Sequence, residues 1–256
     1  MLRNPIYHRL KEKAHSAAEK IGRPSFYRKY GRELKRSSAA FSKSGIIDIC
    51  RSRIDESKLH PAHGAEHLEK VAIEAGAVLR IEHEETGRPG GDIEGLMLCA
   101  QIAGLLHDVK RLEKDHTVSG SIEAGRILRG LDLSSSLKKY VTAAIRNHEA
   151  FKEVLASKNE QAKLISDSLY DADKFRWGPD NFTVTLWRIL ESTDMPAETL
   201  YCSFREKMEW ITRIKETFRT ETGKKYGPEF IDFGIRIGDE IYKEMTLIMG
   251  NRKKCF

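Results

Sequence analysis

The sequence predicts an all-α fold. Apolar residues recur at intervals of three and four along most of the 256-residue chain, and no segment shows the strict alternation of a half-buried strand. Hydrophobic residues make up 40% of the chain and charged residues 32%, which is typical of globular proteins with enough apolar side chains for a core. Glycines and prolines gather between the periodic segments, where they interrupt the helical pattern.

The periodic segments divide into helices joined by short connections. We expect helices at 3–20, 26–40, 45–57, 63–85, 92–107, 117–130, 135–149, 160–176, 180–192, 200–220 and 228–249. Glycine and proline breakers separate them, for example at 87–91 and 178–179. Ser134 is expected to cap the helix that follows it, because its hydroxyl can accept a hydrogen bond from a free backbone N–H of the first turn.

The net charge of +6 comes from the N-terminal end of the chain. Residues 1–44 carry twelve Lys and Arg against three Glu, a net charge of +9, so the remaining residues carry −3. We therefore divide the chain into a basic helical N-terminal extension at 1–44, a central helical domain at 45–195 and C-terminal helices at 196–256 that complete the bundle.

The N-terminal extension has two interpretations. Aromatic residues stand between its cations, at Tyr7, Phe26, Tyr27, Tyr30 and Phe41. Cations next to aromatic rings suit a nucleic-acid backbone with stacked bases. Alternatively, the extension is amphipathic, packs its aromatic rings on the rest of the protein and leaves Lys and Arg in water. We favour the second interpretation.

The chain lacks the patterns of a membrane or secreted protein. No run of about 18 apolar residues indicates a transmembrane helix, and charges interrupt the N-terminus where a secretory signal would need an apolar region. We expect a cytoplasmic protein without membrane contact. The C-terminal helices carry apolar residues such as Trp210 and Phe230, which either complete the bundle or form a homodimer contact.

Several polar residues fall on the apolar stripes of predicted helices. His67 leads a stripe that continues through Val71 and Ala75 in steps of four. Asp173 follows Ile165 and Leu169 with the same spacing. The residues that lie on such stripes or at the ends of apolar helices are His67, His107, Asp108, His116, His148 and Asp173.

These side chains point to a metal centre. A lone histidine on an apolar face is usually a satisfied core residue, but six such residues with independent explanations are much less plausible than one shared site. Buried imidazoles and carboxylates are costly unless they are paired, and one divalent metal satisfies several of them together.

Three segments resemble a known family. They read His63-Gly-Ala-Glu66-His67, then Gly104-Leu-Leu-His107-Asp108, then Asp171-Ala-Asp173-Lys-Phe175. This order resembles the H…HD…D signature of the HD superfamily of metal-dependent phosphohydrolases, over roughly residues 60–190. The resemblance implies an HD-type helical bundle and places a phosphohydrolase domain at 45–195.

The resemblance also implies the metal ligands. Four positions match the family's ligand set: His67, His107, Asp108 and Asp173. His116 and His148 match the extra histidines of members with two ions, in which the aspartate of the HD pair bridges both; one and two ions remain open. Imidazole and carboxylate ligands suit Mn²⁺, Fe²⁺, Co²⁺ or Ni²⁺, and zinc is a further option.

Other residues near the motifs have expected roles in catalysis. Glu66 either orients His67 or accepts a proton from water, or it is a surface glutamate. Lys110 and Arg111 follow the HD pair and are expected to neutralise phosphate oxygens. Lys110 stands where the family often has glycine, which puts the local turn in doubt.

Two further residues are expected to bind substrate. Lys174 directly follows the ligand Asp173, and its ammonium is expected to contact phosphate. His63 resembles the first histidine of the family's His-Gly-x-x-His opening and is expected to line the pocket.

The resemblance implies hydrolysis of a phosphate ester or phosphoanhydride, with a nucleotide as the expected small-molecule substrate. The segment after His148 lacks the Gly-Tyr-Pro of members that cleave cyclic dinucleotides, and the regions that accompany guanosine-tetraphosphate hydrolases are absent. The alternative is a nucleic-acid-binding or signalling protein in which the metal is structural.

Overall fold

The computed structural model describes residues 4–85 and 92–250, and within those ranges every regular element is a helix. The all-α prediction is confirmed. In chain order the elements are α1 (Pro5–Ile21), α2 (Ser25–Lys29), α3 (Gly31–Lys43), α4 (Gly45–Ser52), η1 (Glu56–Lys58), η2 (Pro61–His63), α5 (Ala65–Glu85), α6 (Ile93–Leu106), α7 (His116–Ile127), α8 (Ser135–Arg146), α9 (Glu160–Phe175), η3 (Asn181–Thr185), α10 (Leu186–Ser192), α11 (Ala197–Thr212), η4 (Arg213–Glu216) and α12 (Glu221–Met249). None of the described helices has the length and apolarity needed to cross a membrane.

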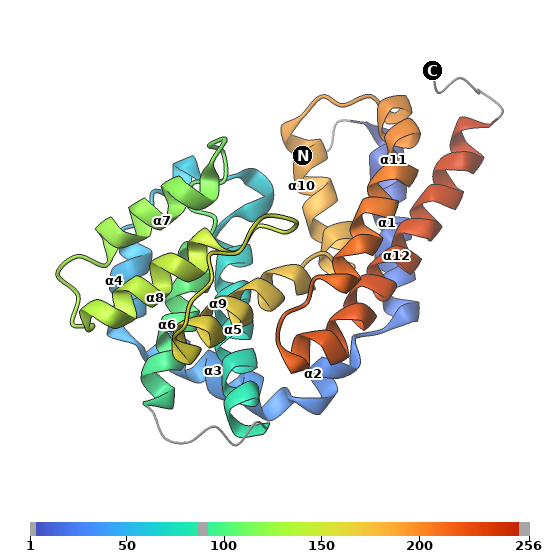
Figure 1. Ribbon diagram of the computed structural model, residues 1–256. Coiled ribbons are helices and arrows are strands. Elements are labelled where there is room, and N and C mark those ends of the chain that lie inside the picture. The colour runs from blue at the N-terminus through green and yellow to red at the C-terminus, as the bar shows by residue number, and fades with distance from the viewer. Residues whose placement is uncertain (1–3, 86–91, 251–256) are drawn as a thin grey trace.

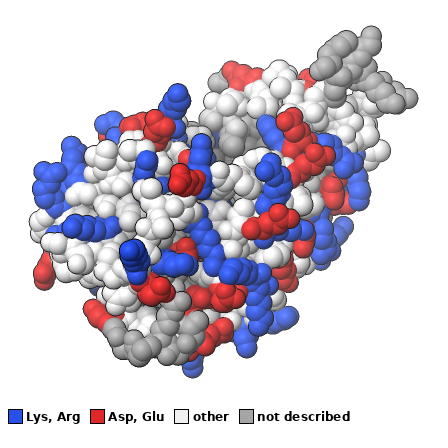
Figure 2. All heavy atoms as spheres, in the orientation of Figure 1, with Lys and Arg blue, Asp and Glu red and all other residues white. Residues whose placement is uncertain are grey.

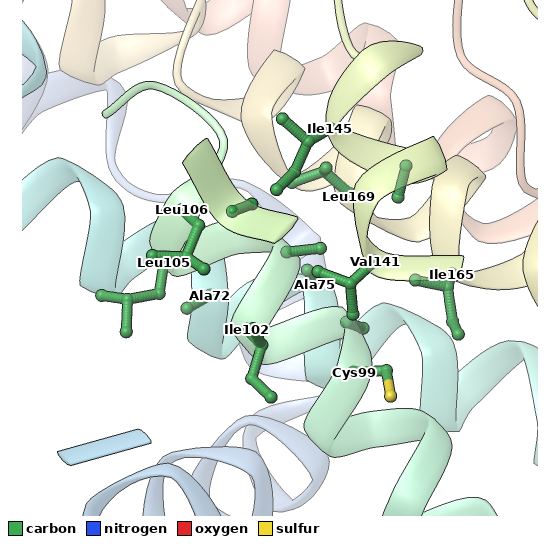
Figure 3. Close-up of a cluster of buried hydrophobic side chains, with 14 of the residues drawn as sticks. Ala72, Ala75, Cys99, Ile102, Leu105, Leu106, Val141, Ile145, Ile165 and Leu169 are labelled. Atoms are coloured by element: carbon green, nitrogen blue, oxygen red, sulfur yellow. The ribbon is translucent and has the colours of Figure 1, made fainter. Parts of the chain in front are cut away.

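The helices pack around two hydrophobic clusters, which Figure 1 shows as two groups of helices connected through α5 and α9. The first cluster joins α5, α6, α8 and α9, and α3, α4 and α7 also contribute buried residues to it. Figure 3 shows part of it, including Leu105 and Leu106 at the end of α6. Both leucines are buried, so the residues that follow them leave α6 from a fixed position in the core.

The second cluster brings the two ends of the described chain together. Helix α1 lies along α12, and α11 packs on α12 as well. Aromatic rings fill the space where α9 enters this cluster: Phe175 stacks on Phe230 with ring centres 4.2 Å apart, and Phe26 lies 5.1 Å from Phe175. Phe26 is fully buried. The N-terminal segment is therefore part of the core.

The aromatic side chains of residues 1–44 face inward. Tyr7, Phe26, Tyr30 and Phe41 are buried. Several cations of the segment pair with acidic residues elsewhere, as Arg9 does with Glu244 and Lys13 with Glu240. On the face shown in Figure 2, Lys and Arg are interspersed with Asp and Glu. This arrangement is the one expected for an amphipathic segment that packs on the body.

Some predicted helix boundaries are wrong. The predicted helix at 228–249 begins at Glu221, because Thr220 caps it through the Gly223 N–H and the helix continues through Pro228. The predicted helix at 26–40 is divided at Tyr30 into α2 and α3. The predicted helix at 200–220 ends its α-helical part at Thr212. The predicted breaker at 87–91 lies outside the described residues.

Replacing Phe26 by alanine tests whether the N-terminal segment belongs to the core. We expect Phe26→Ala to lower the free energy of unfolding by about 3–5 kcal/mol, because a fully buried ring leaves a cavity. Urea denaturation measures the change. Leu247→Ala, at a side chain that is 74% exposed, is the control and should change stability by about 0.5 kcal/mol or less. Equal effects of both substitutions would contradict the described packing.

Candidate metal centre

The six predicted ligand positions lie at the ends of five helices. His67 is in the first turn of α5, His107 and Asp108 directly follow α6, and His116 opens α7. His148 comes just after α8, and Asp173 is in the last turn of α9. Helix ends are suited to this purpose, because the chain turns there and side chains from several helices can meet at one point. All six side chains are buried.

His67, His107 and Asp173 form a compact group. The Nε2 atoms of the two histidines are 3.3 Å apart, and Asp173 Oδ1 lies 3.7 Å from His67 Nε2 and 3.6 Å from His107 Nε2. Each residue offers a ligand atom, and these atoms all lie within 4.8 Å of one another. Three ligand atoms at this spacing can surround one ion.

Asp108 divides its carboxylate between two sets of imidazoles. Its Oδ2 lies 3.4 Å from His107 Nε2 and 2.8 Å from His63 Nδ1. Its Oδ1 lies 3.3 Å from His148 Nε2 and 3.8 Å from His116 Nε2. A carboxylate in this position can bind ions on both of its oxygens.

Backbone carbonyls fix the orientation of two rings. His107 donates from Nδ1 to the Gly104 carbonyl at 2.7 Å, and His148 donates from Nδ1 to the Ile145 carbonyl at 2.7 Å. Each bond holds the proton on Nδ1 and turns Nε2 toward Asp108. This is how metal-binding histidines are commonly oriented by their surroundings.

Charge and burial act in opposite directions at the centre. Burial together with the neighbouring His63 and His107 lowers the pKa of His67 well below its ordinary value, which keeps its ring neutral. Burial alone would raise the pKa of both aspartates, but His107 beside Asp108 and Lys174 beside Asp173 lower it well below the ordinary value. The centre therefore combines a neutral imidazole with buried carboxylate charge.

The residues fit a divalent cation. Asp108 Oδ1 and His148 Nε2 are buried and have no hydrogen-bond partner among the described residues. A buried polar atom without a partner costs about 1–3 kcal/mol. A cation bound between them would satisfy both atoms. Nitrogen and oxygen ligands without cysteine are the set preferred by Mn²⁺, Fe²⁺, Co²⁺ or Ni²⁺.

His116 has a different position from the other five. Its Nε2 accepts a hydrogen bond from Arg111 Nη1 at 2.7 Å, and Arg111 also lies 3.8 Å from Asp108 Oδ1. Burial, and next the Arg111 charge, lower the pKa of His116 to about 4. The lone pair that a second ion would need is thus held by a guanidinium, and a ligand role for His116 stays a prediction.

The predicted substrate residues are divided between the cavity and the protein interior. His63 and Arg111 line a cavity beside the centre. Lys174 does not reach this cavity: its ammonium is buried, donates to the His148 carbonyl at 2.9 Å and pairs with Asp173. It therefore joins the segments that carry His148 and Asp173, which differs from the expected contact with phosphate.

The two remaining predicted residues point away from the ligands. Glu66 is 70% exposed and pairs with Arg188, as expected for the surface alternative. Lys110 pairs with Glu113 at 3.2 Å. The first turn of α5 places His67 inward and Glu66 outward, since adjacent helical residues project about 100° apart.

A buried network that was not predicted from the sequence lies next to the centre. Arg176 pairs with Glu74 at 2.5 Å and donates to the Tyr27 hydroxyl at 2.8 Å, while Tyr27 donates to Glu74 at 2.8 Å. Arg176 also lines the cavity. Its position directly after α9 and three residues beyond Asp173, on the same side of the helix end, is a signal that could have identified it.

The histidine cluster should bind a divalent metal. We expect one Mn²⁺ or Co²⁺ to bind the metal-free protein and raise its melting temperature, because the ion satisfies buried atoms only in the folded state. His107→Ala should weaken binding by about 100-fold or more, since loss of even an outer partner costs about 10–100-fold. Calorimetric titration and metal analysis measure this. His15→Ala, at an exposed site on α1, is the control. A folded protein that binds no transition ion would contradict the metal centre.

Gly104 should be needed for the approach of α5 and α6. A Cβ at this position would lie 2.5 Å from Ala72 Cα and 2.7 Å from Ala72 N. Gly104→Ala should therefore cost about 1–3 kcal/mol of stability and weaken metal binding, because His107 follows on the same helix end. Gly125→Ala is the control, since its Cβ would meet only Thr142 Cγ2 at 3.7 Å. Unchanged stability and metal affinity of Gly104→Ala would refute the tight contact.

Comparison with known proteins finds a solved structure that is similar to this chain. No protein-family model matches the chain, and no curated protein matches it. Among solved structures, the chain is similar to a predicted HD superfamily hydrolase from an uncultured Thermotogales bacterium, with 23% sequence identity and a TM-score of 0.48. The similarity covers 78% of this chain and 90% of that chain.

Proposed function

We propose that this protein is a metal-dependent phosphohydrolase that uses water to cleave a phosphate ester or phosphoanhydride. The observation that supports it most is the shared Asp108 carboxylate. Each of its oxygens faces a different pair of imidazoles, and Oδ1 is buried without a hydrogen-bond partner. Such a carboxylate next to an open cavity suits metal-assisted hydrolysis.

In this proposal the ion is held by the ligand set drawn from the family resemblance: His67, His107, Asp108 and Asp173. A bound divalent ion would polarise a phosphoryl oxygen. It would also lower the pKa of the water bound to it to near neutral. His148 either adds a ligand or contributes to a second ion on Asp108 Oδ1. We propose Mn²⁺, Fe²⁺, Co²⁺ or Ni²⁺, with zinc as the alternative.

The protein's own residues bind and orient the phosphate. Arg111 lines the cavity beside Asp108, and its guanidinium has donors in addition to the one that binds His116. A cation here neutralises phosphate oxygens and stabilises charge that grows on them during hydrolysis. His63, 2.8 Å from Asp108 Oδ2, is within the same cavity wall and can bind a phosphate or leaving-group oxygen.

Nucleotides are the substrate class that the family resemblance implies, and they belong in the first substrate panel. A nucleic-acid-binding role with a structural metal is the alternative. The aromatic rings Tyr7, Phe26, Tyr30 and Phe41 are buried, so stacking on bases through them would require unpacking the core. Nucleic-acid binding without turnover under any metal would favour the alternative.

An activity assay with a matched variant tests the proposal. The metal-loaded protein should release phosphate from an aryl phosphate or from members of a nucleotide panel in Mn²⁺ or Co²⁺. Asp108→Asn should lower kcat/KM by at least about 100-fold, since it removes the charge that faces both sets of imidazoles. Asp132→Asn, at an exposed loop position, should leave kcat/KM unchanged. Protein that binds metal but hydrolyses no phosphate compound would overturn the proposal.

A further inference from the structure

A cavity of about 410 Å³ extends from the metal centre between η3, α10 and α11. We propose that it binds the apolar organic group of a phosphate ester, so that the substrate is an amphiphilic phosphate with an alkyl-like chain. This inference rests on the proposed phosphohydrolase function and specifies its substrate class. The two ends of the cavity differ in chemistry.

The polar end is the metal centre itself. Here the wall is formed by His60, His63, His67, Arg111, Asp173 and Arg176. Arg111 and Arg176 both contribute to this wall, and Arg176 is also held by Glu74 and Asp180. A phosphate group placed here has the Arg111 guanidinium to bind it, and the rest of the ester must extend along the remaining walls.

The other walls are almost entirely hydrocarbon. Their apolar members include Trp177, Leu186, Ile189, Leu200, Phe204 and Trp210. Several belong to the second hydrophobic cluster, and Leu200 and Phe204 are almost completely buried. Each methylene group transferred from water to such a surface increases affinity about threefold to fourfold. The walls therefore favour a ligand that buries hydrocarbon.

A nucleoside matches these walls poorly. Outside the polar end, the polar side chains among the described lining residues are those of Asn181, Thr185 and Lys207, together with the indole N–H groups of Trp177 and Trp210. A base and a ribose carry several donors and acceptors, and each loses affinity when it is buried without a partner. Lys207 is exposed on α11, so it lies toward solvent rather than in the buried part. An alkyl chain has no such groups to satisfy.

Large apolar side chains also lie at the surface near this cavity. Trp210 lies 4.8 Å from Trp177 and 5.3 Å from Phe151, measured between ring centres. Phe151 is 45% exposed and Trp210 is 37% exposed. Phe151 has a positive φ of 62°, which is uncommon for a bulky residue, and it comes three residues after His148. Exposed aromatic rings beside an apolar cavity suit the passage of a hydrocarbon chain.

Binding of non-hydrolysable alkylphosphonates to the full-length, metal-loaded protein tests this inference. From ethyl- to octylphosphonate, the Kd measured by calorimetry should fall about threefold per added methylene until the cavity is filled. Ile189→Asp, which places a charge in the cavity wall, should remove most of this dependence on chain length. Ile122→Asp, at a side chain that is 68% exposed on α7, should keep it. Thermal melting shows whether Ile189→Asp is folded. If it is not, the same measurement is made with Leu186→Asn.

Parallel hydrolysis of alkyl phosphates and nucleotides separates the two proposals. If phosphonate affinity rises with chain length but no ester is hydrolysed, the cavity inference stands and the proposed hydrolysis fails. If nucleotides are hydrolysed while phosphonate affinity is independent of chain length, the cavity inference is overturned and the hydrolase proposal stands. A chain-length dependence that Ile189→Asp leaves intact would also overturn the assignment to this cavity.

Discussion

The Asp108 carboxylate is the constraint around which the site is built. It is almost completely buried, yet His107 keeps its pKa well below the ordinary value, so the charge persists in the interior. Keeping such a charge is costly without partners on all sides. The chain provides these partners from η2, α6, α7 and α8. The close packing of α5 on α6 at Gly104 and the bond from His107 to the Gly104 carbonyl fix the position of this carboxylate.

A second buried polar group connects this site to the rest of the protein. The Glu74–Arg176 pair lies between α5 and the end of α9, and Tyr27 brings α2 into the same network. Arg176 also faces the cavity. The two hydrophobic clusters thus meet at a hydrogen-bonded contact next to the metal centre. A buried ion pair of this kind is sensitive to loss of either partner, which ties the geometry of the site to the packing of the N-terminal segment.

The helical class and two of the predicted ligand positions follow from the sequence for one physical reason, whereas the full predicted ligand set comes from the family resemblance. Helical periodicity reveals a polar residue on an apolar stripe, and His67 and Asp173 are such residues. The orientation of other side chains and some helix boundaries depend on tertiary contacts, which periodicity does not show. Lys174 turns inward because the His148 carbonyl and the Asp173 carboxylate hold its ammonium, and α12 starts before Pro228 because Thr220 caps it. The apolar walls of the cavity come from residues 177–211, but which of these side chains line a cavity depends on how η3, α10 and α11 pack, and periodicity does not show that packing.

The pairing of α1 with α12 has a consequence for biosynthesis. Helix α1 is synthesised before α12, and Phe26 before its partner Phe230. The first hydrophobic cluster can form from residues 31–175 while translation continues. The second cluster closes only after α12 has been synthesised, and until then the apolar faces of α1 and α2 remain exposed to solvent. Contacts between residues this far apart in the sequence slow folding. Until these contacts form, chaperones can bind the exposed apolar faces of α1 and α2.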